Sequence, residues 1–284
     1  MATDRPRTLA FEKWHGAGND FVVVDDRDGR FAPLERADPV AAMCRRGLGV
    51  GADGLIALRV EGGVARMVYY NADGQPSSFC GNGARCFAAF AQRAGLVGVG
   101  EDLRFEAADG AHVGRVLPDG RVRMSMRVAG GVRAHASGDD LVETGSPHLV
   151  RWVDALPAGD ITADARAVRY GPAFAKTGIN VNYVAEQAGG TGLAIRTYER
   201  GVEAETLACG TGVTAAALSY AARGALVGRV EVAVQARGGA LRVRFWRKPD
   251  GTVREAELEG PATRLYAGEL DLAALHIEAG HQTR

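Results

Sequence analysis

Apolar residues in this chain occur in short runs that alternate with glycine-rich turns, a pattern typical of β-strands. Two alanine-rich stretches, 82–94 and 211–223, instead predict helices, and a third helix is predicted over 37–46, with Asp38 as its N-cap and Pro39 at its first position. The runs predict strands at 21–24, 54–58, 65–70, 149–153, 180–184, 193–198, 229–235, 241–246 and 253–258. Many short strands with one dominant helix in each half predict an α+β fold.

The two best helices follow nearly the same tetrapeptide, Cys80-Gly81-Asn82-Gly83 in the first half and Cys209-Gly210-Thr211-Gly212 in the second. The cysteines are 209 − 80 = 129 positions apart. The same spacing relates Gly16 to Gly145, Val24 to Val153, Asp25 to Asp154, Gly49 to Gly178, Tyr69 to Tyr198 and Ala88 to Ala217, and it places Asn19 opposite His148. Matches in one register across the chain indicate two homologous halves.

The duplication predicts two homologous lobes, each a curled β-sheet or barrel around a central helix, with the active site in the cleft between them. The boundary is expected near 118–135, where the sequence is rich in glycine and polar residues. We therefore expect an N-terminal lobe of residues 1–125, to which about 262–284 returns, and a C-terminal lobe of residues 126–261. The first ten residues and the tail after about Leu275 are expected to be irregular.

Composition narrows the classes of function. The 34 basic and 34 acidic side chains cancel, so no basic surface is expected to bind nucleic acid. The N-terminus has no signal-peptide pattern and no run is long enough to span a membrane, so a cytoplasmic protein is expected. The four cysteines, at 44, 80, 86 and 209, match no zinc spacing. Cys44 and Cys86 are interpreted as small buried apolar residues.

Paired thiols at helix starts suggest acid–base chemistry. The start of a helix carries partial positive charge and free N–H groups, which favour a thiolate. A thiolate on one face of a carbon and a thiol on the other can remove a proton and return one to the opposite face, which inverts the stereocentre. The backbone N–H groups of Gly81, Asn82, Gly210 and Thr211 are expected to bind the substrate carboxylate and stabilise the developing charge. This chemistry needs neither pyridoxal phosphate nor a metal.

The span from about Leu9 to Leu272 resembles the diaminopimelate epimerases, cofactor-independent enzymes of lysine synthesis. The matching stretches are Lys13 to Phe21 (KWHGAGNDF), Gly49 to Gly54 (GVGADG), Asn71 to Gly74 (NADG), Cys80 to Cys86 (CGNGARC), Gly145 to His148 (GSPH), Gly178 to Val181 (GINV), Glu199 to Gly201 (ERG), Glu205 to Gly212 (ETLACGTG), and Gly260-Pro261. The related proline racemases are expected to show CGHG at the first cysteine, where this chain has CGNG.

The resemblance implies conversion of LL-2,6-diaminopimelate to the meso form, with Cys80 and Cys209 as the two acid–base thiols. It implies that Asn19, Asn71 and Asn180 bind the amino acid, that Glu199 and Arg200 lie near its second amino and carboxylate groups, and that His148 supports cysteine protonation. The expected partner is this small amino-acid substrate. Neither nucleic acid nor membrane is an expected partner, and a homodimer is the default oligomer.

Two other functions stay open at this stage. The first is a racemase on the same scaffold for a substrate with one stereocentre, and the Glu199-Arg200 pair argues against it. The second is a binding protein without turnover, which would have no use for two poised thiols. Three features depart from the family pattern: Ser146 where Asn is usual, Gly54 where many members carry Gln, and one extra residue between Glu199 and Cys209.

Overall fold

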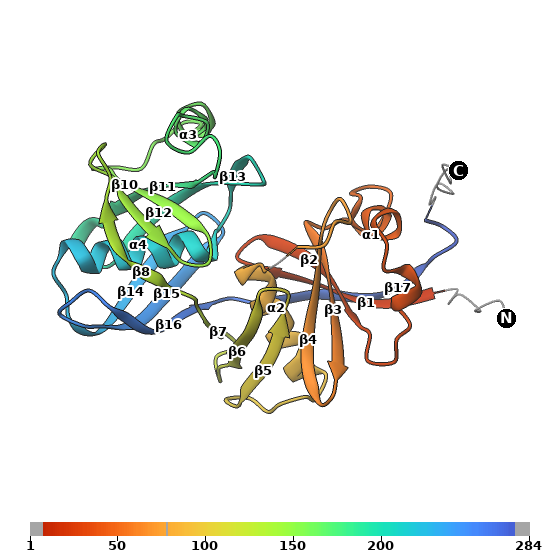
Figure 1. Cartoon of the computed structure of the whole chain (residues 1–284). Helices are drawn as coiled ribbons and strands as arrows, with labels where there is room; N and C mark the ends of the chain where they lie inside the picture. Colours follow the sequence, from red (N-terminus) through yellow and green to blue (C-terminus); the bar gives the residue numbers. More distant parts are fainter. Residues whose placement is uncertain (1–7, 78, 276–284) are drawn as a thin grey trace. The chain divides into compact units, whose positions relative to one another are not determined.

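A computed structural model describes residues 8–77 and 79–275 of the chain (Figure 1). It divides into two compact units, one formed by the residues up to Pro118 together with those from Ala262 on, the other by Asp119–Pro261. The sequence analysis placed residues 119–125 in the first lobe. In the structure they belong to the second unit, because the strand Val122–Ser125 pairs antiparallel with Val253–Gly260.

The described residues of the first unit form ten elements. They are β1 (Thr8–Gly16), β2 (Asn19–Asp25), the 3-10 helix η1 (Ala32–Leu34), α1 (Ala37–Cys44), β3 (Gly54–Glu61), β4 (Val64–Asn71), α2 (Gly81–Arg93), β5 (Asp102–Ala107), β6 (Gly110–Val116) and β17 (Thr263–Asp271). β17 returns from the end of the chain to pair antiparallel with β1. Two expectations differ here. The chain is already a strand from Thr8, and α1 begins at Ala37 with Arg36 as its N-cap, so Pro39 is the third helical residue.

The second unit contains thirteen elements. They are β7 (Val122–Ser125), β8 (Ala129–Ala134), β9 (Asp140–Glu143), β10 (Pro147–Trp152), α3 (Thr162–Arg169), β11 (Asn180–Glu186), the 3-10 helix η2 (Ala188–Gly190), β12 (Leu193–Glu199), β13 (Ala204–Thr206), α4 (Gly210–Arg223), β14 (Gly228–Ala236), β15 (Gly239–Arg247) and β16 (Val253–Gly260). α3 was not predicted from the sequence, and only Ala165 of its eight residues is fully buried. The tail predicted after Leu275 lies outside the described residues.

The two units repeat one pairing scheme. In the first, β2 runs parallel to β3, β3 antiparallel to β4, β4 parallel to β5, and β5 antiparallel to β6. In the second, β10, β11, β12, β14 and β15 follow the same sequence of parallel and antiparallel pairs. The starts of β4 and β12, and those of α2 and α4, are each 129 positions apart (193 − 64 and 210 − 81). This is the offset on which the sequence analysis based its two homologous halves.

A mostly buried helix lies against the strands of each unit. α2 contacts β1, β2, β3, β5 and β6, and α4 contacts β8 to β12, β14 and β15 (Figure 1). Alanine and glycine line much of both helices, so strands can approach them from several sides. The prediction of a strand-rich α+β fold with one central helix per unit is therefore confirmed. No helix among the described residues is both long and apolar enough to cross a membrane.

Candidate active site

Each cysteine of the repeated tetrapeptide is the N-cap of its unit's central helix. Cys80 has φ −131° and ψ 115°, and Cys209 has φ −109° and ψ 111°. The carbonyl of each residue accepts the first helical hydrogen bond, from Ala84 N at 2.7 Å and from Val213 N at 2.9 Å. The thiols thus stand beside the partial positive charge of a helix start, as the sequence predicted.

In the first unit, polar residues gather at the end of the sheet next to Cys80. The Cys80 Sγ donates to Asn19 Oδ1 at 3.4 Å, and Asn19 Nδ2 donates to Asp53 Oδ2 at 2.7 Å. Asn19 is the first residue of β2, and Asp53 immediately precedes the parallel neighbour β3. Parallel strands start at the same edge of a sheet, which is why residues 34 positions apart meet here.

A charged cluster supports this edge. The Asp20 carboxylate accepts from Arg46 Nη2 at 2.6 Å and from Lys13 Nζ at 2.7 Å, and Arg46 Nη2 also donates to the Asp53 carboxylate at 2.8 Å. Burial by itself raises the pKa of Asp20, but the hydrogen bonds and charges of Arg46 and Lys13 outweigh it and lower this pKa to about 2. The carboxylate is therefore ionised at neutral pH and holds Lys13, which is almost fully buried.

Next to the first turn of α2 lies a completely buried cation, Arg85, the fifth residue of the helix. Its guanidinium donates to Asn82 Oδ1 at 2.8 Å. Burial lowers the pKa of Arg85, and the nearby thiols of Cys86 and Cys80 oppose that shift. The backbone of Gly16 lies against this turn, because a Cβ at Gly16 would stand 2.7 Å from the carbonyl oxygen of Asn82. Gly81 and Asn82 are thus fixed at the start of α2.

Asn71, the third predicted asparagine, is the last residue of β4 and is exposed. It pairs across the strands with Gly54, so it lies at the same end of the sheet as Asn19 and Asp53. Gly54 has no room for a side chain, since a Cβ there would lie 2.5 Å from Tyr70 O and 2.7 Å from the Tyr69 ring. In this chain, Tyr69 thus fills the space next to Gly54.

In the second unit, Cys209 has a carboxyl group and a hydroxyl group as neighbours. Its Sγ lies 3.3 Å from Thr211 Oγ1, and it also hydrogen-bonds the side chain of Glu199. Burial raises the pKa of the Glu199 carboxyl, while the hydrogen bonds from Thr206 and Cys209 lower it. Glu199, at the end of β12, thus contacts the thiol itself.

Asn180 and Arg200 meet at the same end of the second sheet. Asn180 Oδ1 accepts from Arg200 N at 2.8 Å, and its Nδ2 donates to Ser146 Oγ at 2.8 Å and to Pro147 O at 2.9 Å. The exposed Arg200 side chain donates to Thr177 O at 3.0 Å. The side chains of Glu199 and Arg200 form no ion pair with each other among the described residues, since each bonds elsewhere.

His148 is buried at the start of β10, paired with Asn180 across the parallel strands. Burial lowers its pKa to about 3, with a smaller contribution from the charge of Arg200, so the ring is neutral at pH 7. Its Nδ1 lies 3.2 Å from Asn182 Nδ2, and its Nε2 has no hydrogen-bond partner among the described residues.

Sequence reasoning missed several side chains that hold the site together, notably Asp53, Arg85 and Asn182. Asp53 and Asn182 are themselves 182 − 53 = 129 positions apart, so the offset between the halves could have identified them as a pair. The interpretation of Cys44 and Cys86 is confirmed, because both are buried and burial raises the pKa of each thiol to about 12.

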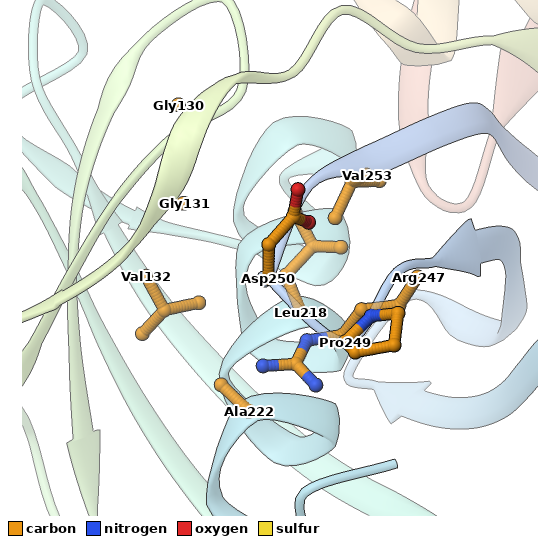
Figure 2. A pocket seen from close by; sticks show the side chains of 10 residues that line it. Gly130, Gly131, Val132, Leu218, Ala222, Arg247, Pro249, Asp250 and Val253 are labelled. Atoms are coloured by element: carbon orange, nitrogen blue, oxygen red, sulfur yellow. The ribbon is translucent and has the colours of Figure 1, made fainter. Parts of the chain in front are cut away.

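The second unit also has a pocket of about 220 Å³, between β8, the β15–β16 loop and α4 (Figure 2). Leu218 and Ala222 form its wall on α4 and Arg247 and Asp250 contribute its charges. These residues lie towards the C-terminal end of α4, whereas Cys209 caps the other end, so the pocket includes none of the candidate residues. No cluster of three or more potential metal ligands occurs in the described part of the chain.

Comparisons with known proteins agree with the geometry. The family model described as diaminopimelate epimerase matches residues 11–135 and 141–264. A diaminopimelate epimerase from Chlorobaculum tepidum is 40% identical over 262 residues, covering 90% of this chain and 99% of that protein. One from Flavobacterium psychrophilum is 37% identical, covering 89% and 97%, and one from Aquifex aeolicus is 34% identical, covering 92% and 98%.

Solved structures show the same fold at low identity. A phenazine biosynthesis protein of the PhzF family from Bacillus anthracis superposes with a TM-score of 0.68 at 14% identity, covering 93% of this chain and 99% of that one. A hydroxyproline epimerase from Agrobacterium vitis, solved with trans-4-hydroxy-L-proline, has a TM-score of 0.64 at 16% identity and covers 93% of both chains. The two-lobed α+β fold predicted from the sequence is thus that of known structures.

Proposed function

This chain belongs to the diaminopimelate epimerase family, and we propose that it interconverts LL- and meso-2,6-diaminopimelate by moving the α-proton between Cys80 and Cys209. The observation that carries the proposal is the equivalence of the two thiols. Each is the N-cap of the central helix of its unit, 129 positions apart, with nearly the same backbone angles. A pair of matched acid–base groups is what inversion at one carbon requires.

In the proposed reaction, one cysteine as thiolate takes the α-proton, and the other as thiol delivers a proton to the opposite face. One S–H bond forms, one S–H bond breaks, and the C–H bond is replaced with inverted configuration. The proposal requires that the two units, acting as the two lobes of the enzyme, bring both thiols to one α-carbon.

Charge develops on the substrate carboxylate as the proton leaves. The N–H groups of Gly81 and Asn82 at the start of α2, and of Gly210 and Thr211 at the start of α4, are suited to stabilise it because partial positive charge collects at a helix start. Asn19 and Asn71 lie at the same end of the first sheet and are proposed to orient the amino acid. No pyridoxal phosphate or metal takes part in this scheme.

Specificity for the second amino-acid group is proposed to rest on Arg200, with Glu199 near the reacting thiol. Arg200 is exposed and held by its backbone to Asn180, so its guanidinium can meet a carboxylate with two parallel hydrogen bonds. Lysine lacks that carboxylate. A charge-assisted hydrogen bond contributes about 1.5–3 kcal/mol, so lysine is expected to react at least about tenfold more slowly.

The test is to incubate the protein with LL-diaminopimelate, L-lysine and L-proline separately and to follow configuration by chiral chromatography. Diaminopimelate should approach a mixture of LL and meso forms, with far lower kcat/KM for the other two. Similar kcat/KM for diaminopimelate and lysine would support a general racemase. Binding of diaminopimelate without any inversion would support a binding protein.

A further inference from the structure

The loop between β12 and β13 carries Arg200 and also an acidic residue, Glu203. Both lie in the segment from Glu199 to Cys209, which is one residue longer than the family pattern. The carboxylate of Glu203 accepts a hydrogen bond from the backbone N–H of Gly201 at 3.1 Å, so it lies close to the backbone that follows Arg200. A carboxylate in this place can compete with a carboxylate of the substrate for the guanidinium of Arg200.

Glu203 pairs instead with Arg169, the last residue of α3. Arg169 Nη2 lies 3.1 Å from Glu203 Oε1, and Arg169 Nε donates to the same oxygen at 3.3 Å. Tyr198 Oη donates to Glu203 Oε2 at 3.0 Å. Burial by itself raises the pKa of Glu203, but its hydrogen bonds and the charge of Arg169 outweigh burial, so this pKa lies below its usual range. Glu203 is therefore a carboxylate at neutral pH, with Arg169 as its counter-ion.

The side chains of Arg169 and Arg200 lie next to each other over Gly178. A Cβ at this glycine would stand 2.5 Å from Arg200 Cδ and 2.9 Å from the guanidinium carbon of Arg169. The carboxylate that Arg169 holds is thus beside the side chain of Arg200. Nevertheless, Arg200 Nη1 donates to Thr177 O, and Glu203 and Arg200 form no ion pair among the described residues. Arg169 thus takes up the acidic group that Arg200 would otherwise meet.

The surroundings of Arg169 favour a positive charge more than they favour its shape. Its Nη1 is buried and has no hydrogen-bond partner in the described part of the chain. A buried donor without a partner is costly, so an apolar residue would suit this position better if it only filled space. The guanidinium carbon also lies 4.7 Å from the centroid of the Tyr170 ring, an arrangement that stabilises a cation. The charge of Arg169, with Glu203 as its partner, is therefore the property that needs a function.

We propose that Arg169 is a positioning residue for substrate specificity, which holds Glu203 away from Arg200 and so keeps the Arg200 guanidinium available to the second carboxylate of the substrate. This inference rests on the proposed function, in which Arg200 binds that carboxylate. Without Arg169, the Glu203 carboxylate should turn to Arg200, and the substrate would have to displace it. The second carboxylate is not at the reacting carbon, so the loss falls on binding and should raise KM without lowering kcat.

The first experiment is the crystal structure of Arg169→Met, a variant that removes the charge and keeps a long unbranched side chain. The expected structure has the Glu203 carboxylate hydrogen-bonded to the guanidinium of Arg200. A Glu203 carboxylate that makes no bond to Arg200 would overturn the proposal. Neither outcome depends on whether diaminopimelate is a substrate, so a failure here is distinct from a failure of the proposed function. If Arg169→Met does not fold, Arg169→Gln replaces it, with the same expected contact.

The second experiment measures kcat and KM for LL-diaminopimelate and for L-lysine, which lacks the second carboxylate. Arg169→Met should raise KM for diaminopimelate about fivefold, the value of one exposed ion pair, at the parental kcat. Its kcat/KM for lysine should stay parental. Adding Glu203→Gln to Arg169→Met should return KM for diaminopimelate to the parental value, because the competing charge is gone.

The matched control is Arg166→Met, on the same helix. The guanidinium carbon of Arg166 lies 5.0 Å from the centroid of the same Tyr170 ring, but Arg166 forms no ion pair with Glu203 among the described residues. This variant should keep the parental KM. An unchanged KM in Arg169→Met, equal losses for diaminopimelate and lysine, or a double variant no better than Arg169→Met would contradict the proposal.

Discussion

The side-chain oxygen of Asn180 accepts a hydrogen bond from the backbone N–H of Arg200 at 2.8 Å, across 20 residues of sequence. Asn180 also donates both amide hydrogens, to Ser146 and to the carbonyl of Pro147. This one buried carboxamide thus ties the start of β11 to the end of β12 and to the turn before β10. Asn180 therefore holds the backbone that carries Arg200. This gives Asn180 a second role to test beside direct contact with the substrate.

Asn180→Ala should lose these three hydrogen bonds and leave Arg200 N and Pro147 O without their partner. We expect a loss of about 1–3 kcal/mol in the free energy of unfolding and a fall in kcat/KM for diaminopimelate. Urea titration and initial rates measure both. The control, Ser146→Ala, removes only one acceptor and should cost less than about 1 kcal/mol. Equal losses in the two variants would mean that the link to Arg200 contributes nothing.

Gly16→Ala tests the close approach of β1 to the start of α2. The new Cβ would lie 2.7 Å from the backbone oxygen of Asn82, which cannot move without shifting the helix start. Overpacking of this kind costs about 1–3 kcal/mol, and activity should fall with it. Gly159→Ala is the control, because its Cβ meets nothing within 4 Å. A Gly16→Ala protein as stable and active as the control would disprove the contact.

The burial of His148 predicts a dependence of stability on pH. Its pKa is about 3 in the folded protein and about 6.5 when unfolded, so between these values the unfolded state binds more protons. Above pH 6.5 the ring is neutral in both states, so its burial does not reduce stability. Below pH 6.5 the free energy of unfolding falls by about 1.4 kcal/mol per pH unit. His148→Gln should lack this contribution. Unfolding curves of the parent and of His148→Gln at pH 7 and pH 5 measure this contribution. The difference in their free energies of unfolding should change by about 2 kcal/mol between the two pH values. A constant gap would contradict the neutral buried ring.

Asp20 predicts a loss of stability in the same direction, but at lower pH. Its pKa of about 2 is below the unfolded value of 3.8, so its contribution is present above about pH 4 and is lost as the pH falls towards 2. Asp20→Asn should reduce stability at pH 7 by about 1–2 kcal/mol, since Lys13 and Arg46 lose their shared carboxylate. The difference from the parent should narrow between pH 4 and pH 2.5. A difference that stays constant with pH would indicate lost packing and not lost charge.

Much of the fold, and the place of Cys80 and Cys209 at helix starts, could be predicted from the sequence, because both depend on local patterns. The helices after Cys80 and Cys209 begin one residue earlier than predicted, and β12 matches the predicted run to within one residue. The offset of 129 positions predicted that the two halves of the chain share one arrangement of strands and helix.

What could not be predicted depends on pairing between distant segments. The return of 262–284 to the first lobe was expected, but not the pairing of β17 with β1, because neither strand has the uniform apolar pattern of a buried strand. Asn19 contacts Asp53, 34 residues away, and Asn182 contacts Leu149, 33 residues away. Each contact arises because two parallel strands are neighbours in a sheet. Short-range periodicity carries no information about such partners.

The central claim is that two cysteines carry the α-proton, and the most direct measurement is the incorporation of deuterium from D₂O. With LL-diaminopimelate and the unsubstituted protein, deuterium should appear at the inverted carbon of the early product, while the remaining substrate stays protonated. Cys80→Ala and Cys209→Ala should each lose inversion by orders of magnitude and keep the parental fold by circular dichroism, while Cys44→Ala should keep the parental rate. Inversion at the parental rate in either Cys80→Ala or Cys209→Ala, or deuterium entering substrate as fast as product, would contradict the account.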